Sequence, residues 1–235
     1  MDQAKTTFTL SPSISIIIAG VIIAGAVVFS GRQPTQPVPA NPQAQTAPAV
    51  DVRKVNISGE PFIGNANAPV TIAYWYDYQC PFCQRNEEQV MPQLIKNYVY
   101  TGKVKIVFKD YQFLGSDSQT LGKLSRAVWE ITPSKFYQWH KAIFDSQGTE
   151  NTGWATTDKI LAISTGVLGA TDAQKAMQLA DKNAAAYQKE MDADKAEGSA
   201  MGISGTPASI IGTELVSGAQ PYASFQAAIE AALKN

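Results

Sequence analysis

The pattern of apolar and polar positions predicts a strand, a helix and a second strand in the middle of the chain. Residues 70–78, VTIAYWYDY, form an apolar run typical of a buried strand. Apolar residues then recur every four positions from Val90 to Tyr98, which predicts an amphipathic helix that Pro92 should kink or divide. Residues 104–111, VKIVFKDY, are rich in β-branched side chains and predict another strand. This order predicts a βαβ unit with two parallel strands.

The second half of the chain is predicted to be mainly helical before it returns to strands. The motifs PASIIG and TELVSG predict a hairpin that turns at Gly212, and residues 221–233 predict a closing helix. We therefore expect an α/β fold with a helical insertion at about 119–201. Four helical segments are expected inside that insertion, at 119–131, 134–146, 156–166 and 172–198.

The N-terminal part differs in composition from the rest. After a short tail at 1–13, residues 14–30 are apolar and uncharged and long enough to cross a membrane. A cleavable signal segment is the alternative, but the apolar run continues past its small residues to Phe29, which favours an uncleaved anchor. Residues 31–51 combine Pro, Gln and Ala, as in an extended linker. The folded domain is expected at 52–235.

Overall charge and cysteine content narrow the function classes. The 235 residues carry a formal net charge of −1, so no nucleic-acid partner is expected. The chain has two cysteines, Cys80 and Cys83, and a bridge between them would close too small a loop to stabilise the fold much. A structural zinc site needs about four ligands, whereas the chain offers two cysteines and one histidine. No metal is expected, and the cysteine pair indicates redox reactivity.

The cysteines lie where the first predicted strand gives way to the helix. There, free backbone N–H groups and the positive end of the helix dipole favour a thiolate at Cys80. Pro81 suits the first helical position, and Cys83 falls one turn along on the same side. We expect Cys80 to be the exposed sulfur that attacks and is attacked, and Cys83 to resolve the mixed disulfide. A purely structural disulfide is the alternative.

Three motifs carry a resemblance to a known family. The sequences GNANAPVTIAYWYDYQCPFC, KFYQWHKAIF and MGISGTPASIIG resemble the DsbA-like branch of the thioredoxin-fold disulfide oxidoreductases, including its membrane-anchored BdbD type. The resemblance covers roughly residues 61–233 and implies a thioredoxin fold with an inserted helical domain. It also implies that Thr206-Pro207 is a cis peptide facing the redox pair, with backbone near Thr206 binding extended substrate. No cofactor is expected.

One position departs from that family. Its members often carry a buried acid six residues before the first cysteine, where this chain has Tyr74. A phenol with a pKa of about 10 is a poor proton acceptor at neutral pH. Asp77 or Lys109 could handle the proton of Cys83 instead, but both also fit ordinary exposed charges, and the sequence favours that interpretation.

Other residues near the motif suggest less specific roles. Tyr78 and Phe82 flank the cysteines and could form an apolar surface for substrate. His140 is the only histidine, and it shares a helix side with Phe136 and Phe144. We therefore expect it to pack in the core or make a structural hydrogen bond rather than act in catalysis.

These observations lead to a functional hypothesis. We expect an enzyme on the extracytoplasmic side of the cell membrane, single-pass and monomeric, that introduces disulfides into exported proteins. The resemblance implies that a quinone-linked membrane partner reoxidises it. A tethered reductase is the alternative, an isomerase ranks third because no separate dimerisation domain is evident, and a non-catalytic thioredoxin-fold binding module is the competing class.

Overall fold

The structure is a computed structural model that describes residues 50–234. The predicted anchor at 14–30 and nearly all of the predicted linker lie outside the described residues. Between residues 50 and 234, no helix is both long and apolar enough to cross a bilayer.

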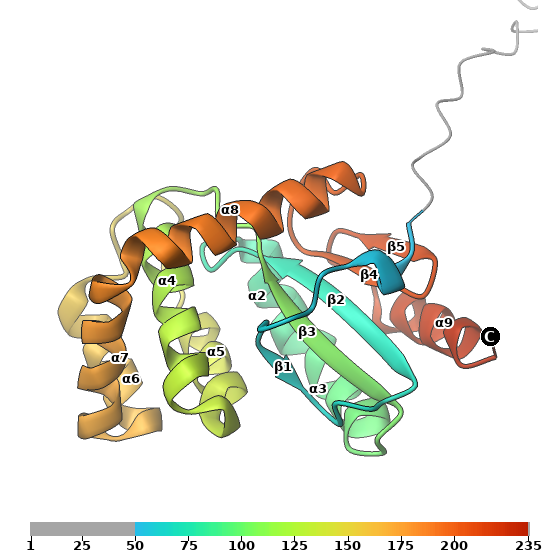
Figure 1. The fold of residues 1–235 in the computed structure, drawn as a ribbon, viewed down its shortest axis with the longest axis horizontal. Helices are drawn as coiled ribbons and strands as arrows, with labels where there is room; N and C mark the ends of the chain where they lie inside the picture. Colours follow the sequence, from blue (N-terminus) through green and yellow to red (C-terminus); the bar gives the residue numbers. More distant parts are fainter. Residues whose placement is uncertain (1–49, 235) are drawn as a thin grey trace, which may run out of the picture. The chain divides into compact units, whose positions relative to one another are not determined.

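A five-stranded sheet in the order β1-β3-β2-β4-β5 forms the centre of the domain (Figure 1). The predicted parallel pairing of β2 with β3 is confirmed, with Tyr74 opposite Phe108. The predicted hairpin is also confirmed: β4 and β5 are antiparallel, and Gly212 turns between them with a φ of +58°. The strands are β1 (Phe62–Ile63), β2 (Val70–Tyr76), β3 (Val104–Asp110), β4 (Ala208–Ile211) and β5 (Glu214–Ser217).

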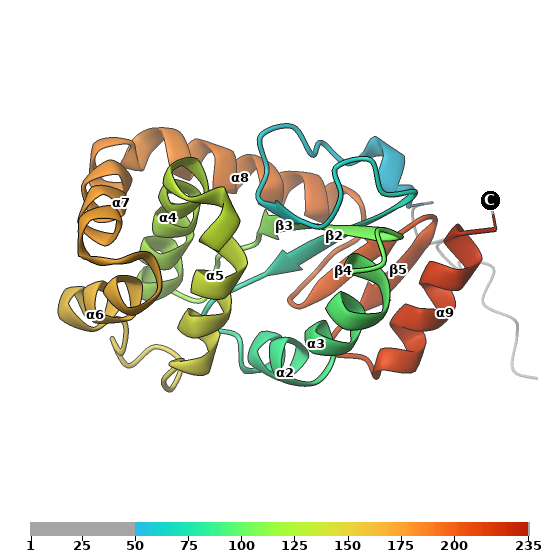
Figure 2. The same cartoon turned by 90° about the horizontal axis from the view of Figure 1, so that it is seen from below.

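Both faces of the central strand β2 are buried. Tyr74 and Tyr76 point into the larger apolar core, whereas Ala73 and Trp75 belong to a second core on the opposite face. Strand residues alternate between faces, which accounts for this division. Figure 2 shows helices on both sides of the sheet, with α8 (Ala184–Ala200) across from α2 (Pro81–Gln89).

The larger core is covered by the helices that the βαβ prediction required. Pro92 divides the predicted helix as expected: α2 ends at Gln89, and α3 (Met91–Leu94) begins anew with the proline in its first turn. A short π-helical turn, η2 (Ile95–Val99), continues toward β3. The predicted closing helix is α9 (Tyr222–Ala232), which packs on β4 and β5.

The helical insertion is confirmed, but its last part was predicted incorrectly. A single helix over 172–198 is wrong, because the chain breaks at Asn183 into two helices. Asparagine is a weak helix former, and the break lets the first helix pack on α4 and α6 while α8 turns toward β3. The helices are α4 (Ser116–Ile131), α5 (Phe136–Asp145), α6 (Thr157–Leu168), α7 (Ala170–Lys182) and α8.

The insertion is bound tightly to the sheet through α8. The indole N–H of Trp75 donates to the carbonyl of Asp194 at 3.0 Å. Gly198 lies against the same ring, since a Cβ at this position would stand 2.8 Å from Trp75 Nε1. Only a residue without a side chain allows this close approach.

Three short elements were not predicted from the sequence patterns. Strand β1 pairs with β3 through Phe62 opposite Val107, but its two residues are too few to show a periodicity. Two single 3-10 turns, η1 (Val52–Lys54) and η3 (Pro133–Lys135), lie before β1 and α5.

Candidate active site

Cys80 is the N-terminal cap of α2, at the predicted junction. Pro81 occupies the first helical position, as expected. The carbonyl of Cys80 accepts hydrogen bonds from the backbone N–H of Cys83 at 3.0 Å and of Gln84 at 3.1 Å. The first turn of α2 thus sets the two cysteines side by side, and both are free thiols.

Neither sulfur is widely exposed. The expectation of an exposed Cys80 is wrong, because the residue is 4% exposed, although Cys83 is still less accessible at 0%. The loop before β4 lies against Cys80. In this loop, Thr206-Pro207 is a cis peptide, as the resemblance implied. In its thiol form, Cys80 Sγ donates to the carbonyl of Thr206 at 3.3 Å. Antiparallel pairing of β4 with β2 brings this loop, 126 residues away in sequence, to the cysteines.

The two thiols have opposite acidity. A hydrogen bond from the Cys83 thiol is the largest cause that lowers the pKa of Cys80, from 9.0 to about 6. Contacts from Thr206 and the backbone N–H groups of Cys83 and Phe82 add to it, while burial opposes it. Burial raises the pKa of Cys83 well above its usual value, and donation to Cys80 raises it further. At neutral pH, Cys80 is a thiolate and Cys83 a thiol.

Asp77 fixes the loop that leads into the cysteines. The expectation of an exposed charge is wrong, because Asp77 is fully buried. Its carboxylate accepts hydrogen bonds from Ser118 Oγ at 2.5 Å and from the backbone N–H of Phe113 and Leu114 at 2.7 and 3.0 Å. It also accepts from the N–H of Gln79 at 2.8 Å. With its lone pairs in use, Asp77 holds the loops together.

Lys109 is also buried, so the expectation of an exposed charge is wrong here too. It lies opposite Trp75 in the sheet, on the face that points away from Tyr74. The structure therefore does not bring it to Cys83. Its ammonium group instead joins a buried ion-pair network that no sequence pattern indicated. The members are Lys109, Arg126, Glu60, Asp110, Asp194, Glu190 and Glu197.

Acidic groups outnumber bases in this network. Burial, followed by the charge of Asp194, raises the pKa of Glu60 to about 8. Arg126 donates to Asp110 at 2.8 Å and to Asp194 at 2.6 Å, which links α4, β3 and α8. The network therefore joins the insertion to the sheet.

Tyr74 and Tyr78 are both fully buried. The proposed place of Tyr78 in an apolar substrate surface is therefore wrong: its hydroxyl donates to Ser125 Oγ at 3.0 Å and contacts His140 Nδ1 at 3.0 Å. His140 is buried in the core and forms a hydrogen bond there, as expected. Phe82 does project outward, since it is 53% exposed, with the guanidinium of Arg85 4.9 Å from its ring centre.

A hollow of about 480 Å³ lies directly beside Pro81, between α2 and the loop after α5. Three of its seven lining residues are glutamines. Gln147 donates to the carbonyls of Tyr78 at 2.7 Å and Cys80 at 3.2 Å, so the insertion supports the redox loop directly. Sequence reasoning missed this residue because a glutamine in a loop carries no motif.

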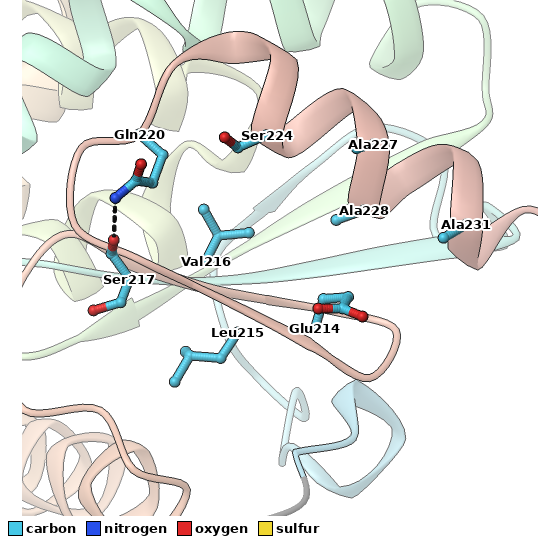
Figure 3. A pocket seen from close by; sticks show the side chains of 9 residues that line it. All are labelled: Glu214, Leu215, Val216, Ser217, Gln220, Ser224, Ala227, Ala228 and Ala231. Atoms are coloured by element: carbon cyan, nitrogen blue, oxygen red, sulfur yellow. Dashed lines mark hydrogen bonds between the residues drawn. The ribbon is translucent and has the colours of Figure 1, made fainter. Parts of the chain in front are cut away.

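A different hollow, about 400 Å³, separates β5 from α9 (Figure 3). Small side chains such as Ala227 and Ala228 line its helical side, and Gln220 donates to the carbonyl of Ser217 at one end. None of the candidate site residues predicted from the sequence lines it. We therefore place the candidate site at the cysteines.

Comparison with known proteins identifies the family of this chain. The family profile described as thioredoxin matches residues 56–231. The chain belongs to the thioredoxin family. It is 29% identical over 182 residues to disulfide bond formation protein D of Bacillus subtilis, covering 77% of this chain and 80% of that protein.

Solved structures show the same fold for this thioredoxin-family chain. Oxidised BdbD from Bacillus subtilis superposes with a TM-score of 0.72 at 24% identity, covering 80% of this chain and 99% of that one. The thiol-disulfide exchange protein alpha-DsbA2 from Wolbachia pipientis gives 0.63 at 24% identity, covering 73% and 86%. The predicted DsbA-like fold and the predicted class, thiol-disulfide oxidoreductase, are thereby confirmed.

Proposed function

We propose that this thioredoxin-family protein is an oxidase that transfers the Cys80–Cys83 disulfide to exported proteins. The observation that carries the proposal is the opposite acidity of the two thiols. A substrate thiolate attacks Cys80, Cys83 leaves, and a second substrate thiol then displaces Cys80, which leaves as a stable thiolate. The products are a substrate disulfide and the reduced pair.

The acidity of Cys80 favours the oxidase direction. At pH 7, a thiol with a pKa of about 6 instead of 9.0 stabilises the reduced state by about 1.4 kcal/mol. For a two-electron couple this raises the reduction potential by about 30 mV. The disulfide form gains nothing comparable, because it has no thiolate. The protein is therefore a stronger oxidant than it would be with an ordinary cysteine.

The site also provides a surface for a polypeptide. Phe82 is an exposed apolar group next to Cys80, the glutamine-lined hollow lies on the other side of Pro81, and the backbone at Thr206 faces the sulfur. We propose that an extended substrate binds across these groups. Residues 14–30 would anchor the protein with this domain outside the membrane, as a monomer that a quinone-linked membrane partner reoxidises.

The reduction potential, measured by equilibration with glutathione, tests the proposed direction. We expect a value above that of thioredoxin, about −270 mV, and shifted toward that of DsbA, about −120 mV, by at least the roughly 30 mV that the acidity of Cys80 contributes. A value near −270 mV would instead support the tethered reductase. Cys80→Ser separates enzyme from binding module, because an enzyme loses thiol-disulfide exchange with a dithiol peptide whereas a binding module retains its partner.

A further inference from the structure

A cluster of buried polar groups lies behind Cys83. Glu87 follows Cys83 by one turn of α2, so the two side chains share a helix face. Glu87 is 1% exposed although it is an acid, and such groups are almost never fully buried without partners. Its partners come from α5: the Tyr137 hydroxyl donates to Glu87 Oε2, and His140 Nε2 contacts Oε1, both at 3.3 Å.

Hydrogen-bond directions at His140 show that this pair holds a transferable proton. The single hydroxyl hydrogen of Tyr78 is donated to Ser125 Oγ, so toward His140 the Tyr78 oxygen acts as an acceptor. His140 Nδ1 must then carry a hydrogen. The contact between His140 Nε2 and Glu87 needs one more, which is located either on the imidazole or on the carboxyl. In both cases, Glu87 and His140 share one proton.

Two further buried polar groups belong to this region, because Tyr74 shares the larger apolar core with Cys83 and Asn86 precedes Glu87 on α2. The Tyr74 hydroxyl and the Asn86 carboxamide approach each other, yet within residues 50–234 neither completes a hydrogen bond of normal geometry. The Tyr74 ring stacks on Tyr76 at 5.8 Å, and Tyr76 contacts the His140 ring edge-on at 4.8 Å. Polar atoms left unpaired in a core cost about 1–3 kcal/mol each, so their presence next to a reactive thiol indicates a role.

The acidity of Tyr74 supports this arrangement. Burial raises its pKa well above 10, and the charges on Cys83 and Glu87 raise it further. At neutral pH the Tyr74 hydroxyl therefore carries a hydrogen that it can pass on while it accepts another.

We propose that the Glu87–His140 pair exchanges a proton with Cys83 through the Tyr74 hydroxyl, beside Asn86. This rests on the proposed function. When a substrate thiolate attacks Cys80, the Cys80–Cys83 bond breaks, a bond forms between the substrate sulfur and Cys80, and Cys83 leaves as a thiolate. That thiolate takes the proton of the pair.

The two substrate thiols release two protons in the complete reaction. One replaces the proton that the Glu87–His140 pair gave to Cys83, and the other goes to solvent, because Cys80 leaves as a thiolate. Reoxidation reverses the transfer. Glu87 and His140 act through Tyr74 and do not touch the reacting sulfurs, so they are positioning residues.

Other ionisable groups face this cluster from each element packed around it. Burial raises the pKa of the surrounding tyrosines, so they keep their hydrogens across the neutral range. Asp110 is paired with Arg126. The groups are Tyr74 and Tyr76 on β2, Tyr78 after it, Cys80 and Cys83 at the start of α2, Tyr137 and Asp145 on α5, Tyr100 after η2, and Asp110 at the end of β3.

The test is the single-turnover rate at which dithiothreitol reduces the disulfide of the full-length protein between pH 5 and 8. Glu87→Gln keeps a hydrogen-bonding side chain but removes the proton donor. We expect it to lower the rate at pH 7 by about 10- to 100-fold and to change the pH profile, because positioned proton donors typically contribute that much or more. The titration midpoint of Cys80 should stay near 6. Glu88→Gln, at an exposed position one residue along α2, should behave as wild type.

Tyr74→Phe separates proton transfer from structural support. Because the Tyr74 hydroxyl lacks a normal hydrogen bond in the described domain, its removal should leave the urea midpoint unchanged or raise it. A slower reduction in this stable variant supports the proposal. Wild-type rates and pH profiles in Tyr74→Phe overturn it, even if Glu87→Gln fails to fold. Failure of the proposed function would look different, since the reduction potential of the wild-type protein would then lie at about −270 mV.

Discussion

Replacing Cys83 by alanine tests why Cys80 is acidic. The hydrogen bond from the Cys83 thiol is the largest cause of the lowered pKa of Cys80. A hydrogen bond to a charged group contributes about 1.5–3 kcal/mol, and one pH unit corresponds to about 1.4 kcal/mol. In Cys83→Ala, the midpoint of Cys80 ionisation should therefore rise from about 6 by roughly 1–2 units.

The assay must follow the midpoint rather than a rate at one pH. With a pKa of about 8, the thiolate fraction at pH 7 falls from roughly nine-tenths to one-tenth. The remaining thiolate is intrinsically more nucleophilic, with a Brønsted coefficient of about 0.4–0.5, so the two effects nearly cancel in an alkylation rate at pH 7. Thiolate absorbance recorded from pH 4 to 10 avoids this cancellation.

Cys83→Ser provides the matched control. Its hydroxyl can still donate to Cys80, so its midpoint should lie between those of wild type and Cys83→Ala. If Cys83→Ala retains a midpoint near 6, the hydrogen bond is not the main cause, and the backbone N–H groups at the start of α2 must account for the acidity.

Three further variants, with Gly166→Ala as a control, test the support around the site by urea denaturation. Because the pKa of Glu60 is raised from 4.5 to about 8, the folded protein keeps this proton at a higher pH than the unfolded chain does. Its contribution to the free energy of unfolding is complete below pH 4.5 and is lost as the pH rises toward 8, by up to about 1.4 kcal/mol per pH unit. Glu60→Gln should flatten that decline, and an unchanged slope would contradict the assignment. Asp77→Ala should cost about 3 kcal/mol or more, because it leaves several buried donors unpaired, and a loss below about 1 kcal/mol would refute that role. Gly198→Ala should cost about 1–3 kcal/mol through its clash with Trp75. Gly166→Ala in α6, with no described atom within 4 Å of the added Cβ, should instead stabilise by about 0.5–1 kcal/mol, and equal effects of the two would exclude the clash.

The parts of the fold that depend on residues close together in the sequence could be predicted. The apolar run of β2, Pro81 at the first position of α2, and Pro92 inside the next helix are local signals with direct structural meaning. The placement of Cys80 at the strand-to-helix junction followed from them. The break at Asn183 could not be predicted in this way, because it depends on the packing of α7 on α4 and α6 and of α8 on β3.

The burial of charged residues could not be predicted in the same way. Asp77 and Lys109 looked like surface charges because isolated Asp and Lys residues usually are. Their burial depends on partners that the fold supplies from far along the chain, such as Ser118 for Asp77 and Asp194 for Lys109. A charge in a buried strand, as at Lys109, was the only sequence signal that a distant counter-ion existed.

The ion-pair network has a consequence for the order in which the domain can form. A chain that emerges from a ribosome or a translocation channel N-terminus first presents Glu60 and Lys109 long before Asp194. The backbone N–H of Asn56 donates to Glu197, which lies even further downstream, at a separation of 141 residues. Until α8 emerges, Glu60 and Lys109 have each other as partners but lack Asp194, so the network stays incomplete. The redox centre near the start of the domain likewise becomes complete only when Thr206, 126 residues downstream of Cys80, is available.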